Sequence, residues 1–257
     1  MEERLLQTQI IYGPVNSRRL GRSLGVNILP TERKVCSFDC IYCQYGFTSQ
    51  KYMHNDIEGL ELPAAAEVAE ALMNSLPAVG DLDAITLAGN GEPTLHPSFR
   101  QIAEAVSRPR DRNKPGVPVC ILSNSSTVNE NSVQVGLSFI DRKIMKLDAG
   151  RESTFQKINR PYPGITLKKI VDGLARLENV EIQALFFSGP VNNASSEEIT
   201  AWLEQLTLIN PVAVQIYTIE RVPADHRVGP LDKGGLEKIA AEARARLPEA
   251  DVRVFLT

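Results

Sequence analysis

The sequence contains few cysteines, and three of its four lie in one short segment. Among 257 residues, Cys120 is the only cysteine outside the span from 36 to 43. We therefore do not expect the disulfide framework that stabilises small secreted proteins. The single remaining thiol is also too little to hold a metal cluster by itself.

Long apolar runs and a large excess of one charge are missing as well. No stretch approaches the roughly 20 apolar residues that a membrane span needs. The first residues, Met1-Glu2-Glu3-Arg4, lack the basic and then apolar pattern of a secretory signal, so we expect a cytoplasmic protein. The net charge of -3 gives no overall attraction to nucleic acid.

Short apolar runs alternate with amphipathic segments along the chain. Several of the short runs are apolar throughout, which is typical of a parallel sheet buried on both faces. Strands are predicted at Leu24–Leu29, Ala84–Leu87, Val119–Ser123, Lys143–Leu147, Glu181–Phe187 and Ala213–Tyr217, with a last edge strand at Val252–Phe255. Helices are predicted at Ala64–Leu76, Pro97–Val106, Thr166–Leu177 and Leu236–Leu247, and from Ser195, with Glu198 completing a capping box.

Six strands alternating with helices predict an α/β fold with right-handed crossovers. A partial (β/α)6 barrel of the TIM type, with mostly parallel strands, and a doubly wound sheet both fit this pattern. We expect one domain over 1–257, divided into an N-terminal extension (1–23), six βα units (24–217) and a C-terminal loop, helix and edge strand (218–257). In either fold the functional site lies at the carboxyl ends of the strands. The basic run Arg108–Lys114 precedes a strand, so we expect a solvated turn at the opposite end.

The three clustered cysteines follow the first predicted strand. Cys36, Cys40 and Cys43 have the spacing Cys-x3-Cys-x2-Cys. Three thiolates on one loop can hold three corners of an iron–sulfur cluster, which is normally closed by about four cysteines. One iron would then stay open, and an open position is where metal chemistry takes place. The alternative is a structural zinc site with His54 as its fourth ligand.

A glycine-rich segment with an acidic residue follows the second predicted strand. It reads Gly89-Asn90-Gly91-Glu92. Glycines let a backbone approach a ligand closely, and Glu92 offers a carboxylate to a cation. The position of the segment after a strand, together with the cysteine loop, makes it strong evidence for a binding site.

Taken together, these residues resemble the radical S-adenosylmethionine (radical SAM) superfamily over nearly the whole chain. A subgroup related to tRNA wyosine synthetases is indicated by Gly13–Gly21 and Cys36–Gln44, supported by Leu147–Ala149 and Asn159–Pro161. The resemblance implies that the three cysteines ligate a 4Fe–4S cluster whose open iron binds S-adenosylmethionine.

The resemblance also implies which residues contact S-adenosylmethionine. Tyr42 would lie against adenine. Gly89, Asn90, Gly91 and Glu92 would hold the methionine amino group, although Asn90 stands where many members have glycine. The ribose or carboxylate would be reached by residues that end the third and fourth predicted strands, namely Ser123, Asn124 and Asp148.

The implied reaction is the reductive cleavage of S-adenosylmethionine to a 5′-deoxyadenosyl radical, which abstracts hydrogen from a substrate. Besides S-adenosylmethionine, an electron donor is needed. The substrate stays open between a tRNA base and a peptide or protein delivered by a small partner protein. Wyosine synthetases carry extra cysteines for a second cluster, and this chain cannot supply them. The rival interpretation is a non-catalytic iron–sulfur or zinc-binding protein.

Several further polar residues have open roles. Lys146 and Asp148 share a strand face, where they could pair or mark a solvated strand end, and Lys146 could contact substrate. Gln215 and Tyr217 also share a face and lead into Arg221, in a loop that could close over substrate. The group Arg18, Arg19 and Arg22 could bind the cofactor carboxylate, an anionic substrate or nothing. Cys120 is expected to be a small buried hydrophobe, and His96 to support the Glu92 loop.

Overall fold

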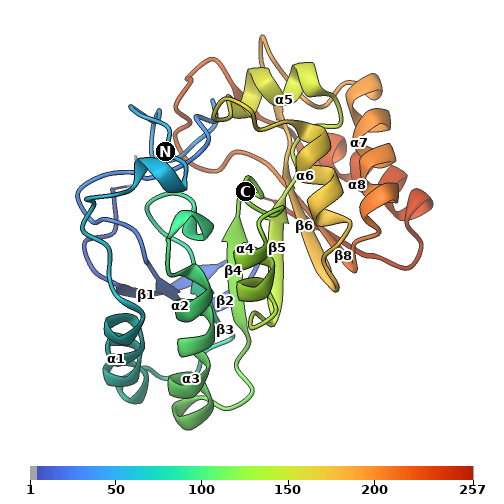
Figure 1. Ribbon diagram of the computed structural model, residues 1–257. Coiled ribbons are helices and arrows are strands. Elements are labelled where there is room, and N and C mark those ends of the chain that lie inside the picture. Colours follow the sequence, from blue (N-terminus) through green and yellow to red (C-terminus); the bar gives the residue numbers. More distant parts are fainter. Residues whose placement is uncertain (1–4, 257) are drawn as a thin grey trace.

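Eight strands form one curved sheet in the order β1-β2-β3-β4-β5-β6-β8-β10 (Figure 1). This computed structural model describes residues 5–256. Met1–Arg4, the start of the expected extension, and Thr257 lie outside the described residues. Within the described residues, no helix is long and apolar enough to cross a membrane.

The strands are short and most alternate with helices. The sheet contains β1 (Ile11–Ser17), β2 (Gly21–Val26), β3 (Ala84–Leu87), β4 (Val119–Ser123), β5 (Arg142–Lys146), β6 (Val180–Leu185), β8 (Ala213–Tyr217) and β10 (Asp251–Phe255), and a small second sheet pairs β7 (Phe187–Ser188) with β9 (Gly229–Pro230). The helices are α1 (Ala65–Ser75), α2 (Phe99–Ala105), α3 (Ser107–Asn113), α4 (Asn131–Leu137), α5 (Glu152–Asn159), α6 (Leu167–Leu174), α7 (Ser196–Ile209) and α8 (Lys233–Arg246), with single 3₁₀ turns at His54–Asp56, Leu76–Ala78 and Pro93–Leu95.

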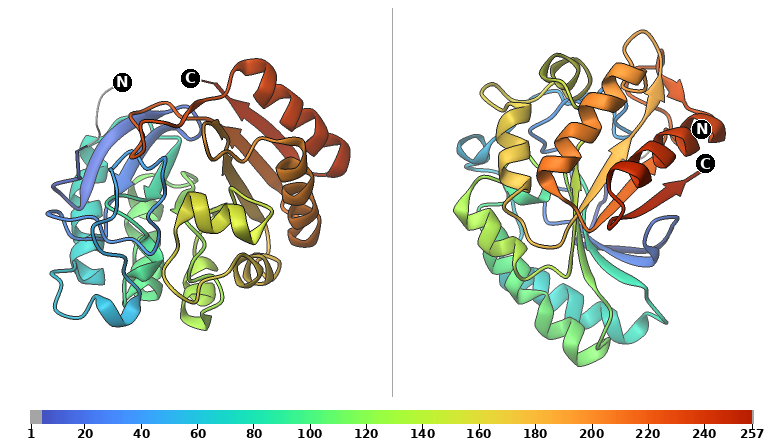
Figure 2. Two further views of the ribbon diagram at one scale, coloured as in Figure 1. Left: turned by 90° about the horizontal axis from the view of Figure 1, so that it is seen from above. Right: turned by 90° about the vertical axis from the view of Figure 1, so that its right-hand side faces the viewer.

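The strand order decides between the two predicted folds. From β2 to β10 every neighbouring pair is parallel, and the order follows the chain without reversal. A doubly wound sheet would reverse its order at a switch point. The sheet instead curls into a crescent with helices on its convex side, as the left view of Figure 2 shows. The predicted partial barrel with mostly parallel strands is therefore confirmed.

Two predicted segments differ from the structure. The extension before residue 24 is part of the sheet, because β1 pairs antiparallel with β2 through a hairpin turn. The run Arg108–Lys114, predicted as a turn, lies mostly in α3. Pro109 occupies the first helical turn, where a missing N–H breaks no bond. Arg110 donates to the carbonyl of Val117 (2.9 Å) and to Asp141 (2.8 Å), which anchors the helix at the amino end of β5.

The helix cap predicted at Ser195 is present, but its partner residue acts differently. The Ser195 hydroxyl accepts from the backbone N–H of Glu198 at 3.3 Å. The Glu198 carboxylate does not return to Ser195, because it accepts from the Thr154 hydroxyl at 2.8 Å. Only the Ser195 half of the capping box is thus formed. The Glu198 side chain, which would make the other half, instead links α7 to α5.

The two faces of the sheet bury different cores. The outer face packs against the helices through residues such as Leu72, Ile85 and Ile102, all fully buried. The inner face carries a smaller apolar cluster of Leu20, Ala84, Cys120, Ile144 and the partly buried Leu122. Leu20 comes from the β1–β2 turn, so this turn covers the inside of the crescent. Cys120 is fully buried there, as expected from its apolar neighbours in sequence.

We predict that Leu72→Ala lowers the free energy of unfolding by about 2–5 kcal/mol, because it leaves a cavity between α1 and the sheet. Urea unfolding followed by the fluorescence of Trp202, the only tryptophan, measures this change. Leu208 is 65% exposed, so Leu208→Ala should change stability by less than about 0.5 kcal/mol. Equal destabilisation by both variants would contradict the assignment of the outer core.

Candidate functional site

A cavity of about 360 Å³ opens at the carboxyl ends of the strands. Its walls include nearly all of the residues that the sequence predicted for a cofactor, namely Cys36, Cys40, Tyr42, Cys43, Gly89, Gly91, Glu92, Ser123 and Asn124. The opposite wall, from β5, β6 and β8, contributes Lys146, Gln183, Tyr217 and the hairpin residue Arg19. Asn90 and Asp148 do not line the cavity among the described residues.

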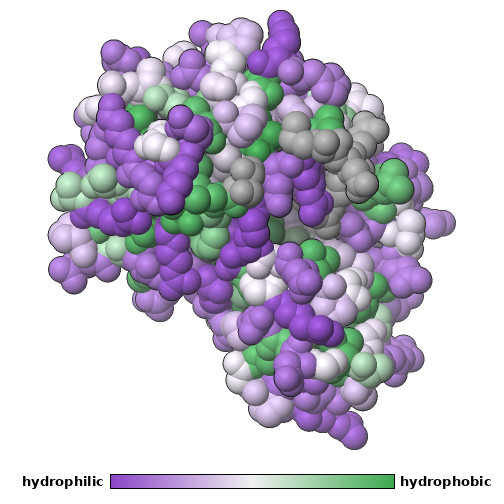
Figure 3. Space-filling view, turned by 180° about the vertical axis from the view of Figure 1, so that it is seen from behind, coloured by the Kyte–Doolittle hydropathy of each residue, from purple (hydrophilic) through white to green (hydrophobic). Residues whose placement is uncertain are grey.

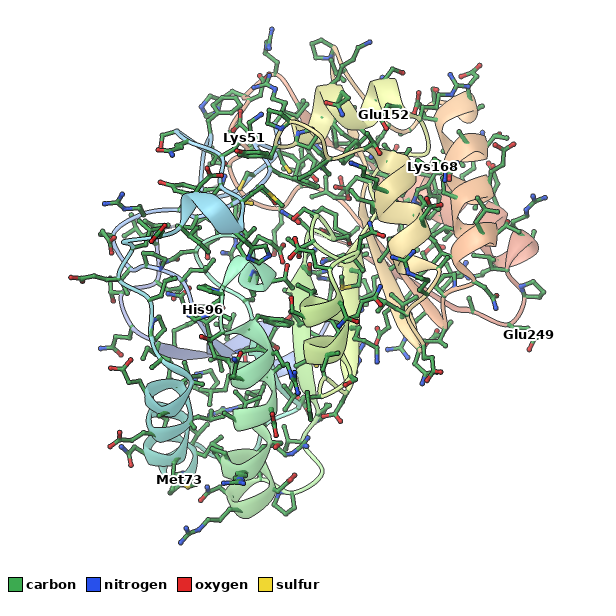
Figure 4. The ribbon with its side chains drawn as sticks, in the orientation of Figure 1. Lys51, Met73, His96, Glu152, Lys168 and Glu249 are labelled. Carbon is green, nitrogen blue, oxygen red and sulfur yellow. The ribbon has the colours of Figure 1, made fainter. Side chains whose placement is uncertain are left out.

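The cavity lies at one end of the molecule. Figure 4 shows sulfur atoms grouped near Lys51, whereas Met73 lies at the opposite end. A second hollow, of about 460 Å³, lies there between α1, α2 and α3 and is lined by Met73 and Arg108. It contains none of the predicted site residues. The face opposite to that of Figure 1 has hydrophobic residues scattered among hydrophilic ones (Figure 3).

Backbone bonds join the cysteine loop to two other segments. Val35 pairs with Gly91 as a parallel bridge, in which Val35 donates to the Asn90 carbonyl (2.8 Å) and Glu92 donates to the Val35 carbonyl (2.9 Å). On the other side, Ile41 donates to the Ile158 carbonyl at 2.9 Å. The cysteines are thus carried on a loop that is bonded along both edges.

The glycines of the second motif make this pairing possible. Gly91 has φ 142°, and a β-carbon there would lie 1.7 Å from the Val35 carbonyl oxygen. A β-carbon at Gly89 would lie 2.2 Å from Asn27 Oδ1. The sequence predicted a close approach to a ligand. The structure shows that both glycines let their own backbone lie close to other residues of the protein, Val35 and Asn27. Both glycines also line the cavity.

The side chain of Asn90, one of the residues predicted to hold the cofactor, makes its contacts away from the cavity. Its side chain is fully buried and faces the N-terminal segment. Asn90 Nδ2 donates to the carbonyls of Gln7 (2.9 Å) and Pro30 (2.8 Å), while Oδ1 accepts from the Gln7 N–H (2.7 Å). An amide satisfied on both ends fixes the loop and has no atom left for a ligand in the cavity.

Glu92 is a buried carboxylate held by four donors. Oε1 accepts from the Thr94 backbone (3.1 Å), the Thr94 hydroxyl (2.6 Å) and the Ser123 hydroxyl (2.9 Å), whereas within residues 5–256 Oε2 accepts only from the Asn124 N–H. Burial raises the pKa of Glu92, and these hydrogen bonds oppose the rise. Because a carboxylate oxygen accepts about two hydrogen bonds, Oε2 can take another donor from a ligand.

Each sulfur of the cysteine loop receives one N–H donor, and the three donors come from different parts of the chain. Lys34 Nζ donates to Cys43 Sγ (3.2 Å), Asn124 Nδ2 to Cys36 Sγ (3.5 Å) and Asn159 Nδ2 to Cys40 Sγ (3.3 Å). Such donors stabilise thiolates and metal–sulfur bonds. The sequence pattern revealed the sulfurs, but it could not reveal donors that lie up to 119 residues away.

Without a metal, the buried thiols hold their protons at neutral pH. Burial raises the pKa of Cys36 to about 12 and that of Cys40 to about 11. Lys34 lowers the pKa of Cys36 and Lys146 lowers that of Cys40, but burial outweighs both. A coordinated metal deprotonates a thiol outright, so these sulfurs become thiolates once a metal binds.

The three thiols suit a cluster better than a single ion. Within residues 5–256, no group of three His, Cys, Asp or Glu side chains converges on one metal ion. Cysteines that ligate a cluster bind it at separate iron atoms, so their sulfurs need not converge on one point. His54, the fourth ligand of the zinc alternative, faces elsewhere, because its Nε2 lies 2.9 Å from Glu130 Oε2.

Tyr42 and Lys146, which line the cavity, form one network with Asp148, which lies behind them. The Tyr42 hydroxyl bonds to Asp148 Oδ2, and Lys146 Nζ lies 3.5 Å from the same oxygen. Burial and Asp148 raise the pKa of Tyr42. Burial lowers the pKa of Lys146, but the charges of Asp148, Tyr217 and Cys40 together outweigh burial and raise that pKa. Asn159 Nδ2 joins the network at 2.8 Å from the Tyr42 hydroxyl. Lys146 is therefore an inward-facing, paired cation rather than a solvated strand end.

The three arginines before residue 24 have three different positions. Arg22 is exposed at the amino end of β2, where its N–H donates to Asp83 (2.7 Å). Arg18 pairs with Glu220 (2.6 Å) and bonds to the Leu256 carbonyl. Arg18, Arg19 and Arg221 line the cavity. The loop after β8 thus closes over the site, and the Asp225 N–H donates to the Ile41 carbonyl at 2.7 Å.

His96 has the supporting role that its place in the sequence indicated. Its Nδ1 accepts from the Ser98 N–H (3.0 Å), and its Nε2 lies 3.1 Å from the Pro63 carbonyl. Burial lowers the pKa of His96 to about 4. The neutral ring therefore fixes the segment that follows Glu92, and its two nitrogens are already engaged.

We predict that Gly91→Ala destabilises the protein by about 2 kcal/mol or more beyond Gly116→Ala, because the new methyl group clashes with Val35. Gly116 also has a positive φ (84°) but open space around it, so it controls for backbone strain. Urea unfolding monitored by Trp202 fluorescence compares the two variants. Equal losses would mean that the Val35–Gly91 contact is not a tight one.

Sequence comparisons agree with this geometry. A family model described as the Radical SAM superfamily matches residues 34–206. A Brachyspira hyodysenteriae protein named GTPase Obg is 33% identical over 238 residues, which are 91% of this chain and 33% of that protein. A UPF0026 protein of Helicobacter pylori is 31% identical over 238 residues, 89% of this chain and 72% of that protein.

The chain thus spans only a third of the first of these relatives. It contains no Gly-Lys pair, so it lacks the phosphate-binding loop motif of many GTPases. The name of that relative therefore says nothing about the chemistry of the 257 residues.

Solved structures support the fold. Streptococcus suis SuiB bound to S-adenosylmethionine matches with a TM-score of 0.63 and 12% identity, over 91% of this chain and 50% of that one. TYW1 with a lysine-pyruvate adduct matches with a TM-score of 0.56 and 16% identity, over 87% of this chain and 73% of that one. The family match, the partial barrel and the loop of three thiols agree: the chain belongs to the Radical SAM superfamily, whose members bind a 4Fe–4S cluster and S-adenosylmethionine.

Proposed function

We propose that this chain binds the cluster through Cys36, Cys40 and Cys43 and abstracts hydrogen from a substrate held in the same cavity. The observation that carries the proposal is the set of three sulfurs, each with its own N–H donor, around a cavity that also contains Glu92. When bound, the cluster and S-adenosylmethionine supply the one-electron chemistry of the family. An electron donor is a necessary partner.

Different residues of the cavity would then hold different parts of the cofactor. Glu92 Oε2 would accept from the methionine ammonium, while Gly89, Gly91, Ser123 and Asn124 form the adjoining wall. The Tyr42 ring lies 5.5 Å from the Phe187 ring between centroids and has the Lys146 ammonium 5.0 Å from its own centroid, and the part of the ring that lines the cavity would contact the adenine.

Two predicted residues act through others in this proposal. Asp148 does not line the cavity, and it fixes Tyr42 and Lys146. Asn90 fixes the loop before Glu92 through its bonds to Gln7 and Pro30. Both are positioning residues. The loop after β8, fastened by the pair of Arg18 and Glu220, limits the entry of water to the cavity.

We predict that Cys36→Ala abolishes both the broad visible absorption of the anaerobically reconstituted cluster and the formation of 5′-deoxyadenosine. Cys120→Ala is the matched control, since Cys120 lies in the inner apolar cluster away from the loop, and it should keep both properties. Chromatography of dithionite-reduced protein with S-adenosylmethionine measures the product. Wild-type protein that holds iron and sulfide but yields no 5′-deoxyadenosine would refute the proposal in favour of a non-catalytic protein.

The same assay separates the two substrate classes predicted from the sequence. Addition of tRNA that raises the rate of S-adenosylmethionine cleavage would support a tRNA base as substrate. Acceleration by a peptide, or by a small protein that purifies with the chain, would support the second class. The cavity of about 360 Å³ admits only the reacting part of either molecule beside the cofactor.

We predict that Lys34→Met lowers the reduction potential of the cluster by on the order of tens of millivolts, because hydrogen bonds to cluster sulfurs stabilise the more negative, reduced state. A redox titration followed by electron paramagnetic resonance measures the potential. Lys51→Met is the control, since Lys51 bonds to the Pro161 carbonyl (2.8 Å) near the same loop without contacting a sulfur. Equal potentials in the wild type and Lys34→Met would refute a role for this donor.

A further inference from the structure

Arg19 enters the cavity from the β1–β2 turn, which supplies none of the residues proposed to hold the cofactor. It lies in the β1–β2 turn, next to Leu20, whose side chain packs on the inner face of the sheet. From there the guanidinium extends to the wall formed by β6 and β8. Glu92, Ser123 and Asn124 follow β3 and end β4, on the other wall.

The contacts of Arg19 orient its charge without neutralising it. Nη1 donates to Gln183 Oε1 (2.6 Å) and lies 3.4 Å from Gln215 Oε1. The guanidinium carbon lies 4.4 Å from the centroid of the Tyr217 ring. Both amides and the phenol ring are uncharged. Among the described residues, no carboxylate pairs with Arg19, and its Nε and Nη2 donors make no hydrogen bond.

The surrounding charges leave this wall positive. Lys146 lines the same cavity. The positive charge of Arg19 opposes the rise in the pKa of Lys146, so the two cations are close enough to repel one another. Two carboxylates lie behind the wall, and each is paired: Asp148 with Lys146, and Glu181, which accepts from Gln215 Nε2, with Arg142. Glu220 at the rim is taken by Arg18, so it does not compensate Arg19.

A guanidinium with three free N–H donors in a partly buried cavity is suited to a planar or tetrahedral oxyanion. Amide groups and an aromatic ring that hold it in place reduce the entropy lost when such an anion binds. The geometry points to Arg19 as the binding site for an anionic group of the substrate, a carboxylate or a phosphate. This inference rests on the proposed function.

The test uses cluster-loaded protein saturated with S-adenosylmethionine under anaerobic conditions. Calorimetric titrations with succinate and with inorganic phosphate probe the two oxyanions separately. We expect the wild type to bind at least one of them and Arg19→Gln to weaken that binding about tenfold or more, because a charged hydrogen bond is lost. Preference for succinate identifies a carboxylate, and preference for phosphate identifies a phosphate group.

Two further variants separate charge from folding. Gln183→Glu places a carboxylate beside Arg19 without removing the guanidinium, and it should weaken anion binding to a similar extent. Arg22→Gln removes an exposed arginine near the same end of β2 that does not line the cavity, and its anion affinity should stay within about twofold of the wild type. Thermal melting of each variant shows that it is folded.

Three results would overturn the inference. The first is a wild type that binds neither anion, and the second is Arg19→Gln with unchanged anion affinity. The third is a parallel loss of S-adenosylmethionine affinity in Arg19→Gln, which would assign Arg19 to the cofactor. If the wild type forms no 5′-deoxyadenosine but still binds the anion through Arg19, the proposed function fails and the anion site stands.

Discussion

The backbone pairing of Val35 with Gly91 is the contact on which the site depends. It joins the loop after β2, which carries the sulfurs, to the loop after β3, which carries Glu92. Two loops of different strands would otherwise be free to move relative to one another. The absence of a side chain at residue 91 lets the two backbones meet, so the distance between the thiols and the carboxylate is set by main-chain hydrogen bonds rather than by flexible side chains.

The remaining polar groups of the cavity are fixed in a similar way. Asp148 holds Tyr42 and Lys146, and Asn159 connects that network to Cys40. A buried network of this kind is strong only when each member is satisfied. The cation of Lys146 is stable in the cavity because a carboxylate lies behind it, whereas Arg19 is held by neutral groups and keeps its charge for a ligand. The two walls therefore offer opposite charges: a carboxylate on one and cations on the other.

Much of the fold could be predicted from the spacing of apolar residues, because the inner strands are short apolar runs and the larger helices have an apolar stripe along one face. The strand β1 was missed, since Ile11–Ser17 contains glycine, proline and polar residues and pairs only along one edge. The helix α3 was missed because an arginine-rich run with proline has little apolar pattern, and its stability comes from contacts of Arg110 with distant residues.

The candidate site was predictable where ligands cluster in sequence. Cys36–Cys43 and Gly89–Glu92 are both local motifs, and the structure brings them together. Asn159 was not recognised as a site residue, and Arg19 could not be told apart from Arg18 and Arg22, because the roles of both depend on partners that only the folded sheet brings near. Asn90 belongs to a motif but faces away from the cavity, which a one-dimensional pattern cannot show.

The hairpin turn that fills the inside of the crescent ties the beginning of the chain to its end. Arg18 contacts Glu220 and the carbonyl of Leu256, and Arg19 reaches β6 and β8. During synthesis on the ribosome the sulfurs emerge well before the loop after β8 that covers them. A nascent chain therefore presents its thiols to oxygen and to free metal ions until that loop has been made, so the cluster is best installed once β8 and its loop have folded.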